Sequence, residues 1–186
     1  MKLWVSLVSV AFVAGCGTTM KPEDFSGREP KLDLYEYFAG ETRAWGLFED
    51  RFGTVRRQFE VVIDGRVENG ELVLDESFIY DDGERDRRVW RINREGEDRY
   101  VGRAGDVVGE AEGLVSGNAL NWRYEMDLKV GDGTWRVNFD DWMFLRPDNV
   151  LINRAKVRKF GLEIGSVSLF FIKSPPANEF SSISNR

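Results

Sequence analysis

Histidine is absent from this chain of 186 residues, and cysteine occurs only once. Without histidine there can be no Ser-His-Asp or Cys-His catalytic centre, no histidine metal site and no histidine-based pH switch. A single cysteine cannot form an intramolecular disulfide. A glycine-rich phosphate loop of the P-loop or dinucleotide type is also lacking. We therefore expect a protein that is not an enzyme and holds no cofactor, since catalysis would have to rely on carboxylates, Tyr, Lys or Ser.

Blocks of positive charge are lacking as well. The chain has 26 Lys and Arg against 32 Asp and Glu, for a net charge of −6, and the two signs are interspersed. This distribution argues against a nucleic-acid partner and against strong electrostatic attraction to anionic lipid. The densest acidic run, at 81–86, lacks the EF-hand spacing and contains Arg85, so we interpret it as a solvated turn and expect no metal site.

The N-terminal segment has the pattern of a bacterial export signal. Lys2 supplies a positive charge, and residues 3–13 form an uncharged, mostly apolar run. At about 1.5 Å per helical residue this run is too short to cross a hydrocarbon core of roughly 30 Å. It ends in Val13-Ala14-Gly15-Cys16, which resembles the lipobox of bacterial lipoproteins. The pattern predicts a signal peptide at 1–15 and a lipidated Cys16; the alternative is an ordinary secretory signal with an incidental cysteine.

Lipidation of Cys16 would make a membrane the first partner of this protein, because each buried methylene contributes about 0.8 kcal/mol. Gly17 follows, and by resemblance to enterobacterial lipoproteins a residue other than Asp there implies export to the outer membrane. We therefore expect a lipid-anchored protein of the bacterial cell envelope, at the periplasmic face of the outer membrane. Residues 16–31 are polar and contain two prolines, which predicts a flexible tether, and 174–186 is predicted to be a disordered tail.

Between residues 32 and 173 the sequence shows the two-residue alternation of half-buried antiparallel strands. The clearest case is 120–130, which a turn at 131–133 joins to a second alternating run. Further strands are predicted at 44–50, 55–63, 71–80, 87–94, 98–104, 107–115, 150–160 and 167–173, with turn signals such as Asp64-Gly65 between them. The stretch 32–39 is ambiguous. About ten strands at this spacing predict an all-β, up-and-down antiparallel barrel, with an open β-sandwich as the alternative.

Four charged residues fall on the apolar faces of these strands: Arg57, Glu76, Arg88 and Asp141. A buried charge is costly unless it is paired or hydrogen-bonded. In one interpretation the four residues form internal ion pairs, or a β-bulge turns one of them outward. In the other, an unpaired inward arginine binds the carboxylate or phosphate of an amphiphile whose tail lies among four further side chains, Trp90, Trp122, Tyr124 and Met126. On the strand at 150–160, counting inward from Val150 and Ile152 would place Arg154 inside as well.

Several stretches together resemble a family of bacterial lipoproteins without an established activity, domain of unknown function family 3833. They are LDLYEYFAGETRAWGLFEDRFG at 32–53, FIYDDGERDRRVWRI at 78–92, DVVGEAEGLVSGNALNWRYEMDL at 106–128, FDDWMFLRPDNVLINRAKVRKFGLEIG at 139–165 and SLFFIK at 168–173. The predicted topology is also similar to that of lipocalins and fatty-acid-binding proteins. The Trp45-Gly46 pair only faintly resembles the lipocalin Gly-x-Trp signature, in reversed order.

These patterns favour a membrane-tethered lipoprotein that binds or carries a hydrophobic or amphiphilic ligand of the lipid or fatty-acyl class. The alternative is a structural or envelope-assembly lipoprotein whose barrel is filled by side chains and binds only another, unknown protein. The volume of the barrel interior separates the two hypotheses, because large inward aromatic side chains could fill it. A cavity of several hundred Å³ lined by Trp122 and Tyr124 would favour the first.

Overall fold

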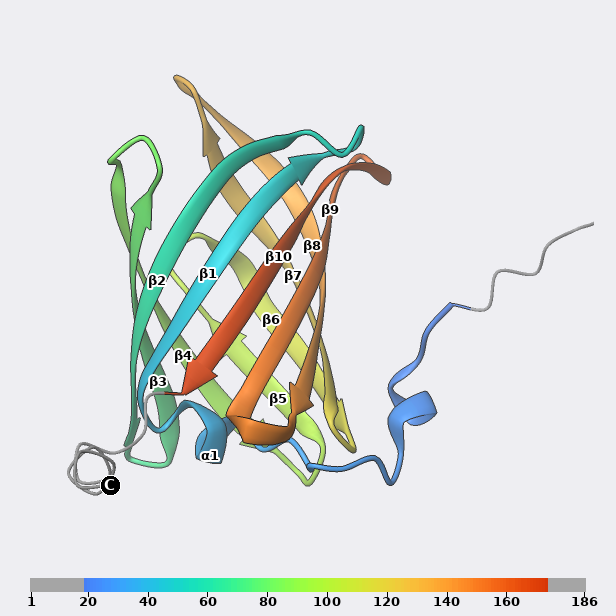
Figure 1. The fold of residues 1–186 in the computed structure, drawn as a ribbon. Helices are drawn as coiled ribbons and strands as arrows, with labels where there is room; N and C mark the ends of the chain where they lie inside the picture. The colour runs from blue at the N-terminus through green and yellow to red at the C-terminus, as the bar shows by residue number, and fades with distance from the viewer. Residues whose placement is uncertain (1–18, 174–186) are drawn as a thin grey trace, which may run out of the picture.

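The computed structural model describes residues 19–173 of the chain. The predicted signal peptide at 1–15, Cys16 and the predicted tail at 174–186 lie outside this range. The described residues form a closed barrel of antiparallel strands, each paired with its neighbours in sequence, and the first strand closes on the last (Figure 1). The predicted up-and-down barrel is therefore confirmed, and the open sandwich is excluded.

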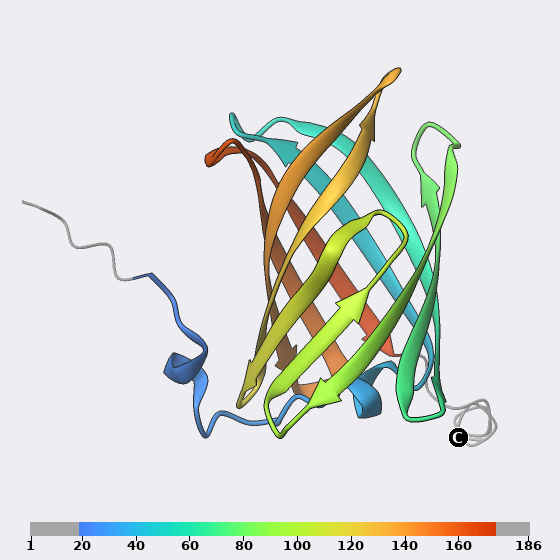
Figure 2. The same ribbon diagram turned by 180° about the vertical axis from the view of Figure 1, so that it is seen from behind.

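Ten strands make up the wall. They are β1 (Gly40–Asp50), β2 (Val55–Glu68), β3 (Glu71–Tyr80), β4 (Arg85–Glu95), β5 (Arg99–Arg103), β6 (Val107–Ser116), β7 (Ala119–Val130), β8 (Gly133–Arg146), β9 (Val150–Lys159) and β10 (Leu162–Lys173). A short 3-10 helix, η2 (Pro147–Asn149), joins β8 to β9. The shortest strand, β5, ends well below the rim on the side seen in Figure 2. Because the sheet closes on itself, it leaves no unpaired edge strand.

The ambiguous stretch at 32–39 contains a short α-helix of five residues, α1 (Leu34–Phe38). Asp33 precedes it in an extended conformation, and its side chain accepts hydrogen bonds from the backbone N–H groups of Tyr35 and Glu36. These are two of the donors that the first turn of a helix leaves without a partner, so Asp33 is a well-formed N-cap. The helix lies across the end of the barrel at which β1 begins (Figure 1).

Two contacts hold α1 against this end of the barrel. At Gly65 the backbone of β2 comes so close to the carbonyl oxygen of Phe38 that a Cβ atom would overlap it. The prediction of a turn at Asp64-Gly65 was therefore wrong: β2 continues to Glu68, and the glycine provides room for the helix. On the other side, Lys173 Nζ donates to three carbonyl oxygens at the end of α1, those of Glu36, Tyr37 and Ala39.

Part of the segment predicted to be a flexible tether packs against the outside of the barrel. Residues Pro22–Phe25 form a 3-10 helix, η1, and the Phe25 ring lies 5.7 Å from that of Trp142 on β8. This contact explains why an aromatic residue occurs in an otherwise polar stretch.

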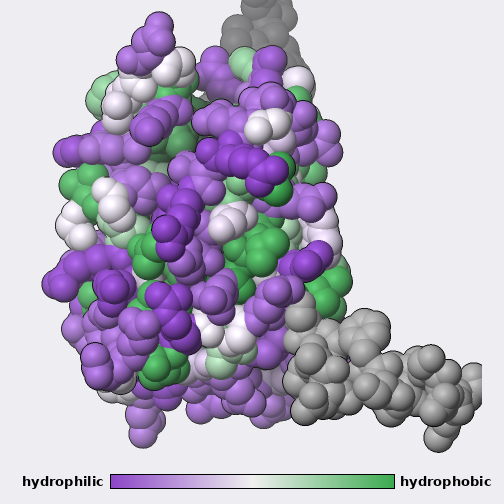
Figure 3. Space-filling model, turned by 90° about the vertical axis from the view of Figure 1, so that its left-hand side faces the viewer, coloured by the Kyte–Doolittle hydropathy of each residue, from purple (hydrophilic) through white to green (hydrophobic). Residues whose placement is uncertain are grey.

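On the face of the barrel that Figure 3 shows, the outer wall is mostly hydrophilic, with scattered hydrophobic side chains. No helix within residues 19–173 is both long enough and apolar enough to cross a membrane.

Inside the barrel, large rings lie opposite glycines. A Cβ atom on Gly46 would come within 2.5 Å of the Phe59 ring, and one on Gly102 within 2.7 Å of Trp122. Trp122 also covers Gly113 on β6. Small residues on β1, β5 and β6 thus make room for aromatic side chains from neighbouring strands, which fill that part of the interior at close packing. The larger cluster of buried side chains includes those of α1. Toward the opposite end of the barrel, the side chains only partly fill the interior.

Candidate ligand-binding cavity

A cavity of about 340 Å³ occupies the barrel interior. Side chains from α1 and from every strand except β5 and β6 line it, and most of them are apolar. This volume lies within the range of roughly 300–1,000 Å³ that is usual for small-molecule sites. The interior is therefore only partly filled by side chains, so the barrel has room for a ligand.

The cavity is closed at the α1 end and accessible at the other. Leu34 and Leu120, which line its closed end, are 2% and 1% exposed. At the opposite end, where the β1–β2, β7–β8 and β9–β10 turns lie, the lining residues Phe48 and Leu128 are half-buried and Lys129 is exposed. A ligand would thus enter past the turns and extend toward the helix.

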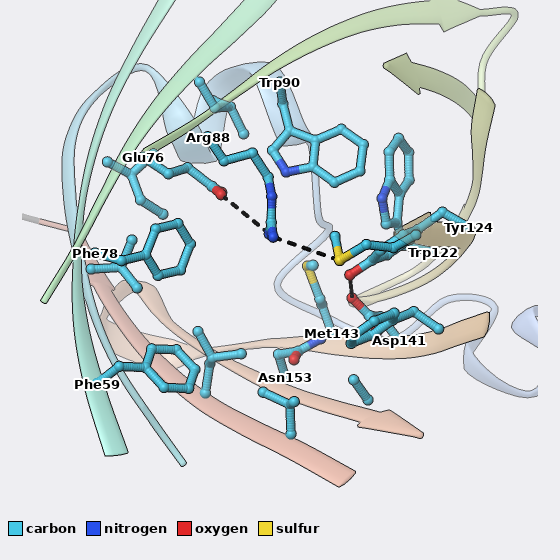
Figure 4. A pocket seen from close by; sticks show the side chains of 18 of the residues that line it. Phe59, Glu76, Phe78, Arg88, Trp90, Trp122, Tyr124, Asp141, Met143 and Asn153 are labelled. Carbon is cyan, nitrogen blue, oxygen red and sulfur yellow. Dashed lines mark hydrogen bonds and ion pairs between the residues drawn. The ribbon is translucent and has the colours of Figure 1, made fainter. Parts of the chain in front are cut away.

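Aromatic rings form one wall of the cavity (Figure 4). Trp90 makes edge-to-face contacts with Trp122 and Tyr124 at centroid distances of 5.7 and 5.4 Å. Tyr124 stacks on Phe139 at 4.9 Å, and it also packs against the cluster that contains the buried Met126. Such pairs add about 0.5–1.5 kcal/mol each beyond burial. The structure brings together all four side chains that the sequence analysis assigned to the ligand tail.

Arg88 projects from β4 into the cavity and is held by two carboxylates. Its Nη2 atom lies 2.8 Å from Asp106 Oδ2, and Nη1 lies 3.9 Å from Glu76 Oε2. A weaker contact of 3.7 Å joins Nη2 to the sulfur of Met126. Burial raises the pKa of Glu76 to about 7, although the nearby Arg88 acts in the opposite direction. The expected pairing of Arg88 with Glu76 is present, but the closer partner is Asp106 in the β5–β6 turn.

Arg57 also lines the cavity, near the open end, with 31% of its side chain exposed. It pairs with Asp82 and Glu84 of the β3–β4 turn, and its guanidinium lies 3.5 Å from the centre of the Tyr80 ring. The expected pairing with Glu76 or Asp141 is therefore not what the structure shows. The acidic run that the sequence suggested to be a solvated turn serves partly to neutralise this arginine.

Asp141 differs from the expectation that it would pair with an arginine. Its carboxylate is 6% exposed and makes no ion pair with any residue in the range 19–173; instead Oδ2 accepts a hydrogen bond of 3.4 Å from the Tyr124 hydroxyl. Its Oδ1 atom has no hydrogen-bond partner there. Burial raises the pKa of Asp141 to about 7, although the hydrogen bond from Tyr124 acts in the opposite direction. This carboxylate is the least compensated charge of the cavity.

Asn153 is a cavity residue that the sequence analysis missed. It is 1% exposed, and neither its side-chain nitrogen nor its oxygen has a hydrogen-bond partner within residues 19–173. The inward face of β9 carries Leu151, Asn153, Ala155 and Val157, whereas Ile152 is 37% exposed on the outside. The prediction that Arg154 points inward was therefore wrong by one residue in register. Counting inward from Leu151 instead of Val150 would have placed Asn153 in the interior.

The fold and its interior define a lipocalin-like barrel with an internal cavity. The family model described as "Protein of unknown function (DUF3833)" matches residues 10–173, and the chain belongs to that family. No curated protein matches the sequence. Within residues 19–173, no group of three or more potential ligand side chains is placed to hold a metal ion.

Several solved structures share the fold, and two of them serve as examples. The S-type phycobiliprotein lyase CPES from Guillardia theta superimposes with a TM-score of 0.57 at 9% identity, over 76% of this chain and 91% of that one. A protein of unknown function from the DUF3598 family of Nostoc punctiforme PCC 73102 gives a TM-score of 0.56 at 13% identity, over 78% of this chain and 50% of that one. At such identities the likeness establishes the barrel architecture and nothing about activity.

Proposed function

We propose that the protein is a lipid-anchored lipoprotein of the bacterial envelope, at the periplasmic face of the outer membrane, and that its barrel binds an amphiphilic ligand of the lipid or fatty-acyl class. The observation that carries this proposal is the cavity of about 340 Å³, apolar along most of its wall and open at one end. A purely structural barrel would not need to leave such a volume unfilled, because empty apolar space costs stability. The cavity thus supports binding over the alternative of a filled barrel.

The arrangement of the lining suggests how an amphiphile would lie. Its apolar tail would pack against Trp90, Trp122 and Met126 inside the barrel. Burial there contributes about 25 cal/mol per Å² of apolar surface removed from water. The polar side chains Arg57 and Arg88 lie along the same cavity, so a polar part of the ligand would also find partners. The barrel of the phycobiliprotein lyase is a precedent for the architecture alone.

The proposed anchor rests on the sequence pattern around Cys16 and fits the start of the described chain. Thr19 borders a surface hollow on the outer wall together with Asn138 and Arg158. Three residues of extended chain span about 10 Å, so a lipid on Cys16 would hold this wall close to the membrane surface. A lipoprotein tethered in this way would be within reach of membrane lipids.

The decisive experiment is to ask whether the intact protein carries a lipid. The full chain, purified from membranes, is examined by native mass spectrometry and then extracted under denaturing conditions for lipid analysis. We expect a co-purifying amphiphile. Val157→Phe, which places a ring in the cavity, should lose it, whereas Ile152→Phe on the outer face of the same strand should retain it. Absence of any lipid from the wild-type protein would contradict the proposal.

A further inference from the structure

The two arginines of the cavity are already neutralised by the protein itself. Arg57 faces two carboxylates from the β3–β4 turn, and Arg88 lies between Glu76 and Asp106. The charge of each guanidinium is thus compensated within the protein, while the Nε atom of Arg57 near the open end has no hydrogen-bond partner among residues 19–173. Asp141 is a further carboxylate of the cavity, and it forms no ion pair with any residue in the range 19–173. The buried part of the cavity therefore has a surplus of acidic groups, which disfavours a ligand with a negative charge.

The same wall has unused hydrogen-bonding capacity. Asp141 Oδ1 and both polar atoms of the Asn153 side chain are buried, line the cavity and lack a partner within residues 19–173. In the β8–β9 register Asp141 lies opposite Ala155, two residues from Asn153, so the two side chains are diagonal neighbours on one face. Figure 4 shows both of them directed into the cavity. A buried polar group without a partner costs about 1–3 kcal/mol.

We propose that Asp141 and Asn153 form a recognition subsite for the hydroxyl group of an uncharged amphiphile, and that the cavity selects such ligands over fatty-acid anions. A hydroxyl group can donate to Asp141 Oδ1 and accept from the side-chain nitrogen of Asn153 at the same time. A plain hydrocarbon tail would leave these atoms unpaired, and a carboxylate could only accept hydrogen bonds next to a carboxylate. This inference rests on the proposed function, because it concerns the ligand of the same cavity.

The test compares two ligands of equal chain length, 1-monomyristoylglycerol and myristate. A form of the chain beginning at Thr18 is suitable, because all ten strands and the described core lie within residues 19–173. Binding is followed by the fluorescence of Trp90 and Trp122, which line the cavity. We expect the glycerol ester to bind at least about tenfold more tightly at pH 8, the equivalent of one well-made hydrogen bond.

Two variants locate the effect. Asn153→Leu keeps a similar volume and should weaken the glycerol ester by about tenfold with little change for myristate, whereas Asn138→Leu on the outer wall should change neither. Asp141→Asn should strengthen myristate binding, because it removes the uncompensated charge. Equal or tighter binding of myristate by the wild-type protein would overturn the inference but leave the proposed function intact. No effect of Asn153→Leu would mean that buried water satisfies these atoms, and binding of neither ligand would count against the proposed function itself.

A separate observation concerns the outside of the open end. Three large apolar side chains stand exposed on two adjacent turns: Phe52 at 77%, Phe160 at 90% and Leu162 at 68%. We call them the apolar tip. The turns are neighbours because β1 pairs with β10, and the Arg51 N–H donates to the Ile164 carbonyl oxygen at 3.1 Å. Exposed apolar side chains in such a group mark an interaction site.

We infer that the apolar tip inserts into the surface of a lipid bilayer. Arg51 lies over the Phe52 ring at 4.7 Å, and Lys159 lies 5.5 Å from that of Phe160, so each ring has a cation beside it that can reach lipid phosphates. Thr19, near the proposed anchor, shares its surface hollow with Arg158, which is next to Lys159 in sequence. The anchor and the tip would therefore face one membrane, with the cavity mouth at its surface.

The test uses the full chain reconstituted into vesicles of phosphatidylethanolamine and phosphatidylglycerol. Phe160→Cys and Val67→Cys are labelled with a fluorescent dye, and the parent chain, which has only Cys16, gives the background. Val67 is 51% exposed near the opposite end of β2 and is the matched control. On reconstitution the dye at 160 should lose most of its quenching by aqueous iodide, whereas the dye at 67 should not. Equal quenching at both positions would overturn the inference, whichever ligand the cavity binds.

Discussion

Asp141→Asn should stabilise the empty barrel at neutral pH and leave it unchanged in acid. The pKa of Asp141 is raised from 3.8 to about 7 because its carboxyl is buried, although the hydrogen bond from Tyr124 opposes the shift. The folded state therefore holds this proton over a pH range in which the unfolded state has lost it. The contribution of Asp141 to the stability of the wild-type protein is therefore fully present below its unfolded pKa of 3.8. It is lost as the pH rises through its folded pKa of about 7.

The size of this effect follows from the shift. One pKa unit corresponds to about 1.36 kcal/mol, so a shift of roughly three units costs the wild-type protein about 4 kcal/mol of unfolding free energy above pH 7. Asparagine has nearly the same shape, and its amide oxygen can still accept from Tyr124. The difference between variant and wild type should thus be small near pH 4 and grow to about 4 kcal/mol near pH 8.

The assay is urea denaturation of the ligand-free form beginning at Thr18, at a series of pH values from 4 to 8. Asp140→Asn, on the opposite face of β8, is the control. Burial raises the pKa of Asp140, but the hydrogen bonds from Asn121 and Arg123 outweigh this effect and hold the pKa below its ordinary value. Its replacement should lower stability at neutral pH and matter less in acid, which is the opposite trend. A difference for Asp141→Asn that does not vary with pH would refute the reasoning, because it would mean that Asp141 titrates normally.

Three further perturbations test other parts of the structure. Arg88→Met should lower the unfolding free energy by about 3–5 kcal/mol, and adding Glu76→Gln should recover part of the loss in a double-mutant cycle. Gly65→Ala should cost about 1–3 kcal/mol in thermal or urea unfolding because its methyl group would collide with α1, whereas Gly105→Ala, with open space around it, should be nearly neutral. Cys16→Ser should abolish lipidation; a variant that stays with membranes after alkaline washing and shows no mass change would contradict the lipobox interpretation.

The barrel could be predicted from sequence because its strands alternate cleanly. In β7, for example, every second residue from Leu120 to Met126 is apolar and faces the interior. The alternation failed in β9, where Val150, Leu151 and Ile152 are apolar in succession, so that either face could be the inner one. The pairing of Asn153 with Met143 on β8 and with Leu169 on β10 fixes which face of β9 is the inner one, and this information is not local.

The candidate site was predictable in its apolar part and less so in its polar part. The strand pattern correctly brought Trp90, Trp122 and Tyr124 to one cavity. It could not identify the partners of the arginines, because Asp106 and Asp82 lie in turns, where the two-residue rule does not apply. Which carboxylates reach the two arginines depends on where each turn lies relative to the neighbouring strands, and the alternation within a strand does not give that position.

Closure of the barrel by its first and last strands determines when this protein can fold. Thr42 of β1 lies opposite Lys173 of β10, so the pairing joins the two extremes of the described chain. Because a chain is synthesised from its N-terminus, β10 is completed last, and until then β1 and β9 remain open edges that can pair with other chains. Lys173 also binds the end of α1. A product truncated before β10 would therefore lose both the seam and the contact of Lys173 with α1, and its open edge strands would be exposed to aggregation and proteolysis.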